Sequence, residues 1–554
     1  MPPLVRSVST FALLLSSMSV AWAEPAPPRL IVAIAVDQFS GDLFNEYRAQ
    51  FSGGLGRLTQ GAVFPRGYQS HAATETCPGH STILTGGRPA RTGIIANRWF
   101  DVHQKRDYKG VYCAEDERVN RPTGKDDYDV SGVHLKVPTL GDRMKAANPA
   151  SRVVALSGKD RAAVMMGGAK ADGVWWWSKQ GFTTYGRRVS PDVATVNASA
   201  LAMLGMDQPG MPLPPACAAH DYPVALAHDK LVGTGRFARK AGEASPFNAS
   251  PALDAATLML ADKLIDSMKL GQQSQTDLLA ISLSATDYIG HTFGTEGAEM
   301  CIQMHYLDQA LGGFFAHLDA LGIDYVVMLT ADHGGHDTPE RSAANAITDA
   351  QRVDPALTAS AKLASPPEGL DKALANATKL PGKLIYGDGA FGDMYLAPTL
   401  NKSQREEVVA AAMKLWTHHP QVQQVFTHAE LAAAPAPHGP PDTWSLRDEA
   451  RASFDPERSG DFVVLLKPRV TPIADTDHGY IATHGSPWDY DRRVPILFWR
   501  KNMAGFEQPN SVETVDIMPT LAALIGLSIP GNEIDGRCLD LDPGEGTSCP
   551  VAGK

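Results

Sequence analysis

Six short apolar runs, separated by helical patterns, constrain the fold of this chain more than any other feature. The runs cover residues 30–36, 152–157, 277–284, 325–330, 461–466 and 494–499. Strands that are apolar on both faces are typical of buried parallel sheets. Helical patterns lie between them, for example at 253–270 and 299–321. The alternation predicts an α/β fold, a sandwich of helices around a large, mostly parallel sheet with right-handed crossovers.

Two long tracts interrupt this alternation, at about 172–250 and 337–482. The second contains a Pro-rich connector at 432–444. We interpret both tracts as insertions that form a cap over the sheet of one catalytic domain, residues 24–554. The Trp triplet at 175–177 is expected to be sheet core rather than a substrate platform.

The N-terminus has the pattern of an export signal. Arg6 precedes an apolar stretch at 11–23, which ends in the small-residue cleavage pattern Ala21-Trp22-Ala23. The stretch is shorter than the ~20 residues that a membrane span needs, and no Cys follows it to carry a lipid anchor. We therefore expect a signal peptide at 1–23 and a periplasmic or secreted protein without a membrane segment after cleavage.

Composition limits the possible partners and suggests disulfides. The net charge is −11 and no dense Lys/Arg run occurs, which argues against a nucleic-acid partner. Nothing in the sequence predicts an oligomeric state. Six Cys in an exported chain favour disulfides, with fifteen possible full pairings. The pair 538–549 flanks a short acidic loop and is the simplest to accept, 77–113 is plausible, and 217–301 is left by elimination.

Charged and metal-binding side chains follow four of the predicted strands. They are Asp37, the pair Lys159 and Arg161, the pair Asp287 and His291, and the pair Asp332 and His333. Ligands of open α/β sheets bind beyond the carboxyl ends of the strands. One such strand ending is common by chance, but four of this composition predict a shared site at one sheet edge.

Three Asp and three His in this set suit metal binding. Asp287 and His291 are four residues apart and share a helix face. His484 lies beside a Gly before the last strand, and we prefer it to the rivals His336 and His478. Mixed N/O ligands favour Zn²⁺, so we predict two zinc ions. A metal pair ~4 Å apart can stabilise both the attacking and the leaving oxygen in phosphoryl transfer.

Thr76 and Cys77 stand side by side where a helix is predicted to begin, with Pro78 in its first turn and Gly86-Gly87 at its end. A helix N-terminus favours an anion such as phosphate. A metal on the Thr76 oxygen would make it a nucleophile; without metals Thr76 is only a good capping residue. His80 is interpreted as structural.

The ordered motifs resemble the alkaline phosphatase superfamily, and within it the secreted, Thr-nucleophile phosphomonoesterases of the PafA type. They are AVDQF, TETCPGHSTILTGG, GIIANRWFD, SGKDR, SATDYIGH, TADHGGH and THGSPWDYDRRVP, in order across residues 31–497. Each motif alone is moderately specific, and the ordered set is highly specific. The resemblance implies an alkaline phosphatase-like three-layer sandwich.

The resemblance also implies roles for individual residues. One zinc would bind Asp37, Asp332, His333 and the Thr76 oxygen, and the other would bind Asp287, His291 and His484 and activate the hydrolytic water. Asn97, Lys159 and Arg161 match the positions that hold phosphoryl oxygens. The implied reaction is hydrolysis of small-molecule phosphate monoesters through a phospho-threonine intermediate.

Three alternative functions can be compared with the phosphatase interpretation through individual residues. Superfamily sulfatases use a formylglycine from a C-x-P-x-R motif, but here Pro78 is adjacent to Cys77 and the Arg is missing, which favours a disulfide or packing role. A nucleotide pyrophosphatase/phosphodiesterase resembles the chain in its Thr, Asn and metal ligands; Lys159 and Arg161 favour a monoester dianion instead. A metal or phosphate scavenger would need no Thr76 nucleophile.

Overall fold

The protein is described by a computed structural model that covers residues 26–106, 108–119, 128–360, 362, 366–477 and 479–550. The expected signal peptide at 1–23 and the rival ligand His478 lie outside these described residues. Within the described residues, no helix combines the length and the apolarity that crossing a membrane requires.

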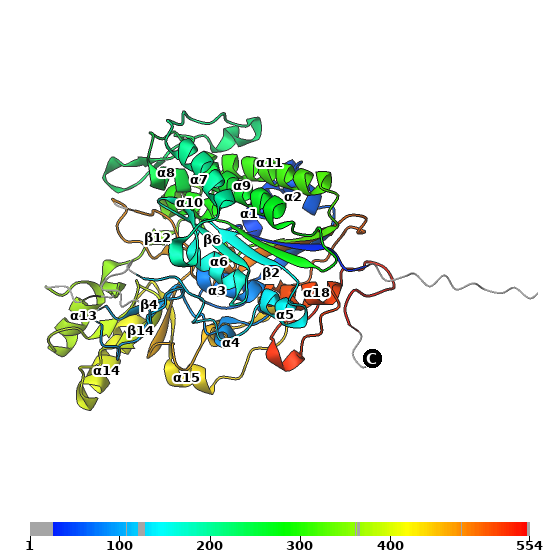
Figure 1. The fold of residues 1–554 in the computed structure, drawn as a ribbon. Helices are drawn as coiled ribbons and strands as arrows, with labels where there is room; N and C mark the ends of the chain where they lie inside the picture. Colours follow the sequence, from blue (N-terminus) through cyan, green and yellow to red (C-terminus); the bar gives the residue numbers. More distant parts are fainter. Residues whose placement is uncertain are drawn as a thin grey trace, which may run out of the picture.

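A ten-stranded sheet forms the centre of the molecule (Figure 1). Its strand order is β19-β2-β18-β11-β1-β10-β5-β6-β7, with β20 beside β2. The neighbours β11, β1, β10, β5 and β6 are parallel. The strands are β1 (Leu30–Val36), β2 (Ala62–Tyr68), β5 (Val153–Ser157), β6 (Gly173–Ser178), β7 (Gly181–Thr183), β10 (Asp277–Leu283), β11 (Tyr325–Thr330), β18 (Arg493–Arg500), β19 (Phe506–Glu507) and β20 (Val512–Glu513).

Helices cover both faces of this sheet, as Figure 1 shows. Alternate residues of β1 enter two separate cores: Val32 and Ile34 pack with α9 (Pro251–Met268) and α11 (Ala298–Ala320). Ile31 and Ala33 pack with α5 (Leu140–Ala147) and α18 (Ile517–Leu524) on the other face. Because both faces are buried, the strand is apolar throughout. The predicted three-layer α/β sandwich is confirmed.

Two of the predicted parallel strands are antiparallel. The run at 494–499 is β18, which is antiparallel to β11 and β2. The run at 461–466 is β16 (Phe462–Leu466), in a separate four-stranded sheet with the order β13-β14-β16-β15. Alternate residues of β16 enter two different apolar clusters. Burial on both faces produces a continuous apolar run whatever the strand direction, which explains both errors.

The two interrupting tracts differ in how they join the sheet. The first, 172–250, begins with β6 and β7 of the main sheet, so its first residues are not an insertion. The Trp triplet of β6 is at most 9% exposed, as expected of sheet core. The remainder includes α7 (Pro191–Leu204), which packs on α9.

The second tract, 337–482, has its own apolar core. That core lies between the small sheet and α13 (Gly369–Thr378) and α14 (Lys402–His418). In Figure 1 these elements lie to one side of the main sheet. The other strands of the small sheet are β13 (Ile385–Tyr386), β14 (Gly392–Leu396) and β15 (Val422–Thr427).

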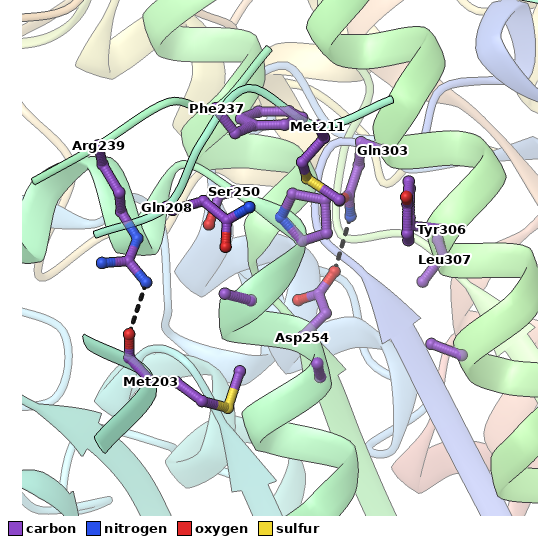
Figure 2. Close-up of a pocket in the computed structure, with 14 residues that line it drawn as sticks. Met203, Gln208, Met211, Phe237, Arg239, Ser250, Asp254, Gln303, Tyr306 and Leu307 are labelled. Atoms are coloured by element: carbon purple, nitrogen blue, oxygen red, sulfur yellow. Dashed lines mark hydrogen bonds between the residues drawn. The ribbon is translucent and has the colours of Figure 1, made fainter. Parts of the chain in front are cut away.

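A cavity of about 230 Å³ lies among α9, α11 and the loops after α7 (Figure 2). Its walls are mostly apolar, and its buried polar groups include Asp254 and Gln303. Asp254 accepts hydrogen bonds from Gln303 Nε2 at 2.8 Å and from the backbone N–H of Ala285 at 2.9 Å. Ala285 is the first residue of α10 (Ala285–Phe293), so this carboxylate supports the helix N-terminus from which Asp287 projects.

All three predicted disulfides are present, namely Cys77–Cys113, Cys217–Cys301 and Cys538–Cys549. Cys217 lies in the first interrupting tract and Cys301 in α11, so their bond ties the tract to the helical layer. The two partners are 84 residues apart in the sequence, whereas Cys538 and Cys549 are 11 apart.

We predict that replacing Cys217 and Cys301 with Ala lowers the free energy of unfolding by about 4 to 5 kcal/mol, because cross-links that close long loops restrict the unfolded chain most. The matched control replaces Cys538 and Cys549 with Ala and should cost about 3 kcal/mol. Urea unfolding followed by Trp fluorescence measures both. An equal or larger loss in the control pair would contradict the prediction.

Candidate active site

Four adjacent parallel strands, β11, β1, β10 and β5, deliver most of the predicted site residues to one edge of the sheet. Asp37 directly follows β1, and Asp287 lies in the first turn of α10, just after β10. Asp332 follows β11, and Lys159 is the capping residue of α6 (Asp160–Gly167) after β5. The structure thus brings together side chains that are up to 295 residues apart, from Asp37 to Asp332.

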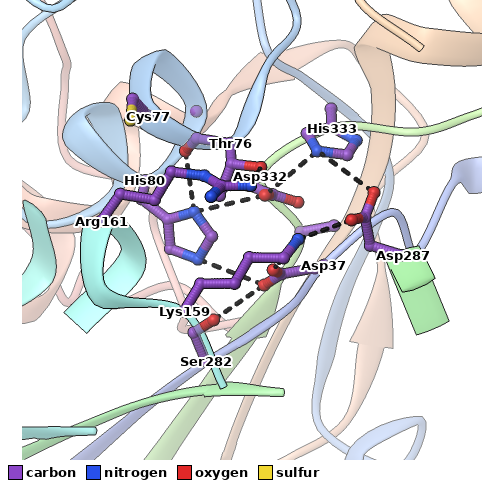
Figure 3. A network of polar contacts seen from close by, with 12 residues as sticks. Asp37, Thr76, Cys77, His80, Lys159, Arg161, Ser282, Asp287, Asp332 and His333 are labelled. Carbon is purple, nitrogen blue, oxygen red and sulfur yellow. Dashed lines mark hydrogen bonds and ion pairs between the residues drawn. The ribbon is translucent and has the colours of Figure 1, made fainter. Parts of the chain in front are cut away.

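Three buried carboxylates form the centre of this site (Figure 3). Lys159 Nζ lies between two of them, 2.9 Å from Asp37 Oδ2 and 2.6 Å from Asp287 Oδ2. Asp332 Oδ2 lies 3.2 Å from His333 Nε2 and 3.3 Å from His80 Nδ1. The lysine therefore sits at the middle of the cluster as a counter-charge.

Backbone carbonyls fix the three expected histidine ligands in one tautomer. The Nδ1 atoms of His291, His333 and His484 lie 2.8, 2.8 and 2.7 Å from the carbonyl oxygens of Ala482, Gly334 and Thr74. An N–H at Nδ1 leaves the Nε2 lone pair free, as metal-binding histidines require. All three Nε2 atoms are directed at Asp287 Oδ1, at 3.3, 4.0 and 3.4 Å.

Two groups of side chains have the geometry to hold a metal ion: Asp287 with His333 and His484, and Asp37 with Asp332 and His80. In the described part of the chain, Asp332 Oδ2 and His333 Nε2 are buried without a hydrogen-bond partner. A buried carboxylate oxygen and a buried imidazole nitrogen that face each other are the kinds of ligand atom that a divalent cation binds. The residues present therefore fit metal ions.

This grouping differs from the sequence-based assignment at three histidines, because His333 takes the place expected for His291 and His80 takes the place expected for His333. His333 was expected with Asp37 and Asp332, but it lies between Asp332 and Asp287. His80, interpreted as structural, joins the second group. His336, the rival ligand, forms a hydrogen bond between its Nε2 atom and Thr471 Oγ1 at 3.1 Å. It belongs to neither group.

Two further site residues were missed by the sequence reasoning. Gln38 donates its backbone N–H to Asp332 Oδ1 at 3.1 Å and its side-chain N–H to Asp287 Oδ1 at 3.2 Å. Its φ of 64° lies in the left-handed region, a strained conformation for a residue other than Gly. Ser282 donates to Asp37 Oδ1 at 2.8 Å. Gln38 stands within the quoted AVDQF motif, so its position was a signal that could have been used.

The electrostatics keep the carboxylates of Asp287 and Asp332 ionised. Burial by itself would raise the pKa of Asp287, but His291 and Lys159 outweigh it and lower that pKa well below its usual value. His333 and His80 do the same for the pKa of Asp332. Burial alone would lower the pKa values of His333 and His80, but the nearby carboxylates raise both above the usual imidazole value. Burial and the nearby His333 lower the pKa of His484 to about 4, so its imidazole is neutral at neutral pH.

The predicted nucleophile is the first residue of α3 (Thr76–Ile83), a buried helix that begins at the site. A side chain at Gly79 would stand 2.0 Å from the carbonyl oxygen of Asp332, so only Gly permits this close approach of α3 to the end of β11. Cys77 is bonded to Cys113 and has no free thiol to convert to formylglycine. This agrees with the disulfide role expected for Cys77.

The predicted phosphate-binding residues lie around Thr76. Arg161 Nη2 donates to Thr76 Oγ1 at 3.3 Å, and its Nε is buried without a partner among the described residues. Asn97 Oδ1 accepts from the backbone N–H of Cys77 at 2.8 Å. The site thus has the hydroxyl of Thr76 at the start of a helix, an unused N–H donor on Arg161, and a cluster of side chains that fits cations. This arrangement could bind an anionic ester and attack it.

Comparison with known proteins identifies the family to which this chain belongs. The model of the type I phosphodiesterase/nucleotide pyrophosphatase family matches residues 31–487. Alkaline phosphatase PhoK of Sphingomonas sp. is 60% identical over 529 residues, covering 94% of this chain and 93% of PhoK. The chain belongs to the alkaline phosphatases of this family.

Further relatives agree with this assignment. Alkaline phosphatase PhoD of Zymomonas mobilis is 49% identical, covering 94% of this chain and 90% of PhoD. The crystal structure of alkaline phosphatase PafA superposes with a TM-score of 0.79 at 23% identity, over 93% of this chain and 99% of PafA. The alkaline phosphatase fold expected from the sequence motifs is therefore confirmed.

Proposed function

We propose that this chain is an exported alkaline phosphatase that hydrolyses small phosphate monoesters through a phospho-threonine intermediate at a two-zinc site. The observation that carries the proposal is the contact between Arg161 Nη2 and Thr76 Oγ1, beside two groups that fit cations. When bound, the metal ions would lower the pKa of hydroxyl groups and balance developing negative charge. Export is inferred from the signal-like segment at 1–23.

The proposed roles follow from charge and position. Thr76 starts α3, where the backbone N–H groups and the helix dipole favour the phosphoryl group. Arg161 orients that group for in-line attack by the Thr76 oxygen. We propose that Asp287, His291 and His484 hold one cation and that Asp37 and Asp332 hold the other. His333 lies between Asp332 and Asp287 and would complete one of the two sets. Positioning and charge stabilisation would supply most of the rate enhancement.

Lys159 and Arg161 distinguish this proposal from a phosphodiesterase, the second function that the family description allows. A monoester dianion offers three free oxygens and two charges to cationic donors, whereas a diester offers fewer oxygens and one charge. Lys159 Nζ lies within the carboxylate cluster and Arg161 beside Thr76. These positions support the proposal that both donors bind the phosphoryl group.

We expect activity to depend on bound metal, because three buried carboxylates converge with several histidine side chains at one point. A chelator should abolish turnover of p-nitrophenyl phosphate, and added zinc should restore it. We also expect an alkaline optimum, since the attacking hydroxyl and the hydrolytic water must both lose a proton. Metal analysis must accompany the assay; full activity in a verified metal-free sample would refute the proposed site.

Thr76 should be the nucleophile. Thr76→Ala should remove most of the rate and Thr76→Ser should keep part of it, because a hydroxyl remains. Thr195→Ala, on an exposed part of α7, is the matched control and should keep full activity. Mapping the phosphopeptide from trapped enzyme should locate phosphate on Thr76, and phosphate on another residue would exclude this mechanism.

Replacing both Lys159 and Arg161 with Ala should lower monoester kcat/KM by about two to four orders of magnitude, since each hydrogen bond to a charged group contributes roughly 1.5–3 kcal/mol. Hydrolysis of bis-p-nitrophenyl phosphate should fall much less. Because Lys159 also pairs with Asp37 and Asp287, metal content is measured in the same samples. Equal loss of both activities in a metal-loaded variant would favour the phosphodiesterase reading.

A further inference from the structure

A chain of hydrogen bonds connects the Arg161 side chain to two tyrosine hydroxyls and one carboxylate. Tyr112 OH accepts from Arg161 Nη1 at 3.4 Å and donates to Asp160 Oδ1 at 2.7 Å. Tyr128 OH donates to Asp160 Oδ2 at 2.8 Å, and the rings of Tyr112 and Tyr128 lie 4.6 Å apart. The backbone N–H of Arg161 donates to Asp160 Oδ1 at 2.7 Å. Both oxygens of Asp160 are therefore engaged.

This arrangement orients the guanidinium of Arg161 and leaves part of its N–H donors without a protein acceptor. Within the described residues, Arg161 forms no ion pair with a carboxylate at 4.0 Å or less, and its Nε has no acceptor. An Arg paired directly with Asp160 would have its charge satisfied by the protein. Here the phenol of Tyr112 stands between the two, so the charge of Arg161 and its free N–H stay available to an anion.

The same segment is tied to the predicted nucleophile. Tyr112 ends β4 (Gly110–Tyr112), and Cys113, the next residue, is bonded to Cys77 beside Thr76. The backbone N–H of Cys113 also donates to the carbonyl oxygen of Asn97 at 3.1 Å. The hairpin of β3 (Arg98–Phe100) and β4 thus fixes Tyr112 relative to both Thr76 and Asn97.

We propose that Tyr112, Asp160 and Tyr128 are positioning residues that hold Arg161 against the phosphoryl group at Thr76. The proposal rests on the role of Arg161 given under the proposed function. A free Arg side chain loses much rotamer entropy when it is fixed on a ligand. Holding it beforehand removes that cost from each binding event, so these residues should matter only through Arg161 and mainly for dianionic monoesters.

A double-mutant cycle tests this coupling. Tyr112→Phe keeps the ring and removes the hydroxyl, and it is made in the wild-type enzyme and in the Arg161→Ala variant. In the wild type we expect monoester kcat/KM to fall about tenfold, equivalent to about 1.4 kcal/mol. In Arg161→Ala the same change should alter the rate less than twofold, because contacting residues are coupled.

Three further measurements complete the design. Tyr128→Phe, which removes only the distal bond to Asp160, should have a smaller effect in the same direction. Tyr222→Phe, at a residue 41% exposed in the first interrupting tract, is the matched control and should change nothing. Hydrolysis of bis-p-nitrophenyl phosphate and inhibition by inorganic phosphate are measured for every variant. Diester activity should stay within twofold, and inhibition by phosphate should weaken in Tyr112→Phe.

The outcomes separate the inference from the proposed function. Equal losses from Tyr112→Phe with and without Arg161, or equal losses on monoester and diester, would mean that Tyr112 acts only on the fold, and the positioning role would be wrong. If Arg161→Ala alone leaves the ratio of monoester to diester activity unchanged, the proposed role of Arg161 itself fails. A loss that occurs only when Arg161 is present supports both.

Discussion

The mutual repulsion of three buried carboxylates is the constraint on which the site depends. Asp37, Asp287 and Asp332 are each at most 2% exposed. Burying an ionised carboxylate costs several kcal/mol even after relaxation, unless positive charge is close. Lys159 supplies one such charge. Histidine side chains whose Nε2 atoms face these carboxylates complete a set of nitrogen and oxygen ligands suited to divalent cations. The arrangement that is costly for folding is therefore the one that the proposed chemistry needs.

The main sheet makes this crowding possible. Parallel strands end at the same edge, and β11, β1, β10 and β5 are direct neighbours, so their following residues must converge. Gln38 then prevents the carboxylates from separating, because its backbone and side chain bind Asp332 and Asp287 at once. Its left-handed backbone is a local strain that the surrounding packing maintains, and Gly79 allows α3 to close on the same point.

Much of this could be predicted from the sequence, because strand burial and strand endings are local signals. The residues after β1, β5, β10 and β11 were expected to meet, and they do. The direction of a strand relative to its neighbours is not a local signal. The runs at β16 and β18 are apolar because both of their faces are covered, and this pattern is the same for parallel and antiparallel strands. Gln38 and Ser282 were missed because their roles depend on distances between segments that only the folded chain defines.

The two halves of the site have different structural origins. The candidate metal-binding residues come largely from the ends of the central strands, together with His484 from a loop before β18. The residues around the proposed phosphoryl position come from helix starts and from the β3–β4 hairpin, outside the main sheet. Under the proposed function, the sheet edge would serve any phosphate ester whose hydrolysis needs two cations. Selection among esters would then depend on Arg161 and the segment behind it, which can change in evolution without disturbing the carboxylates on which the fold of the sheet edge depends.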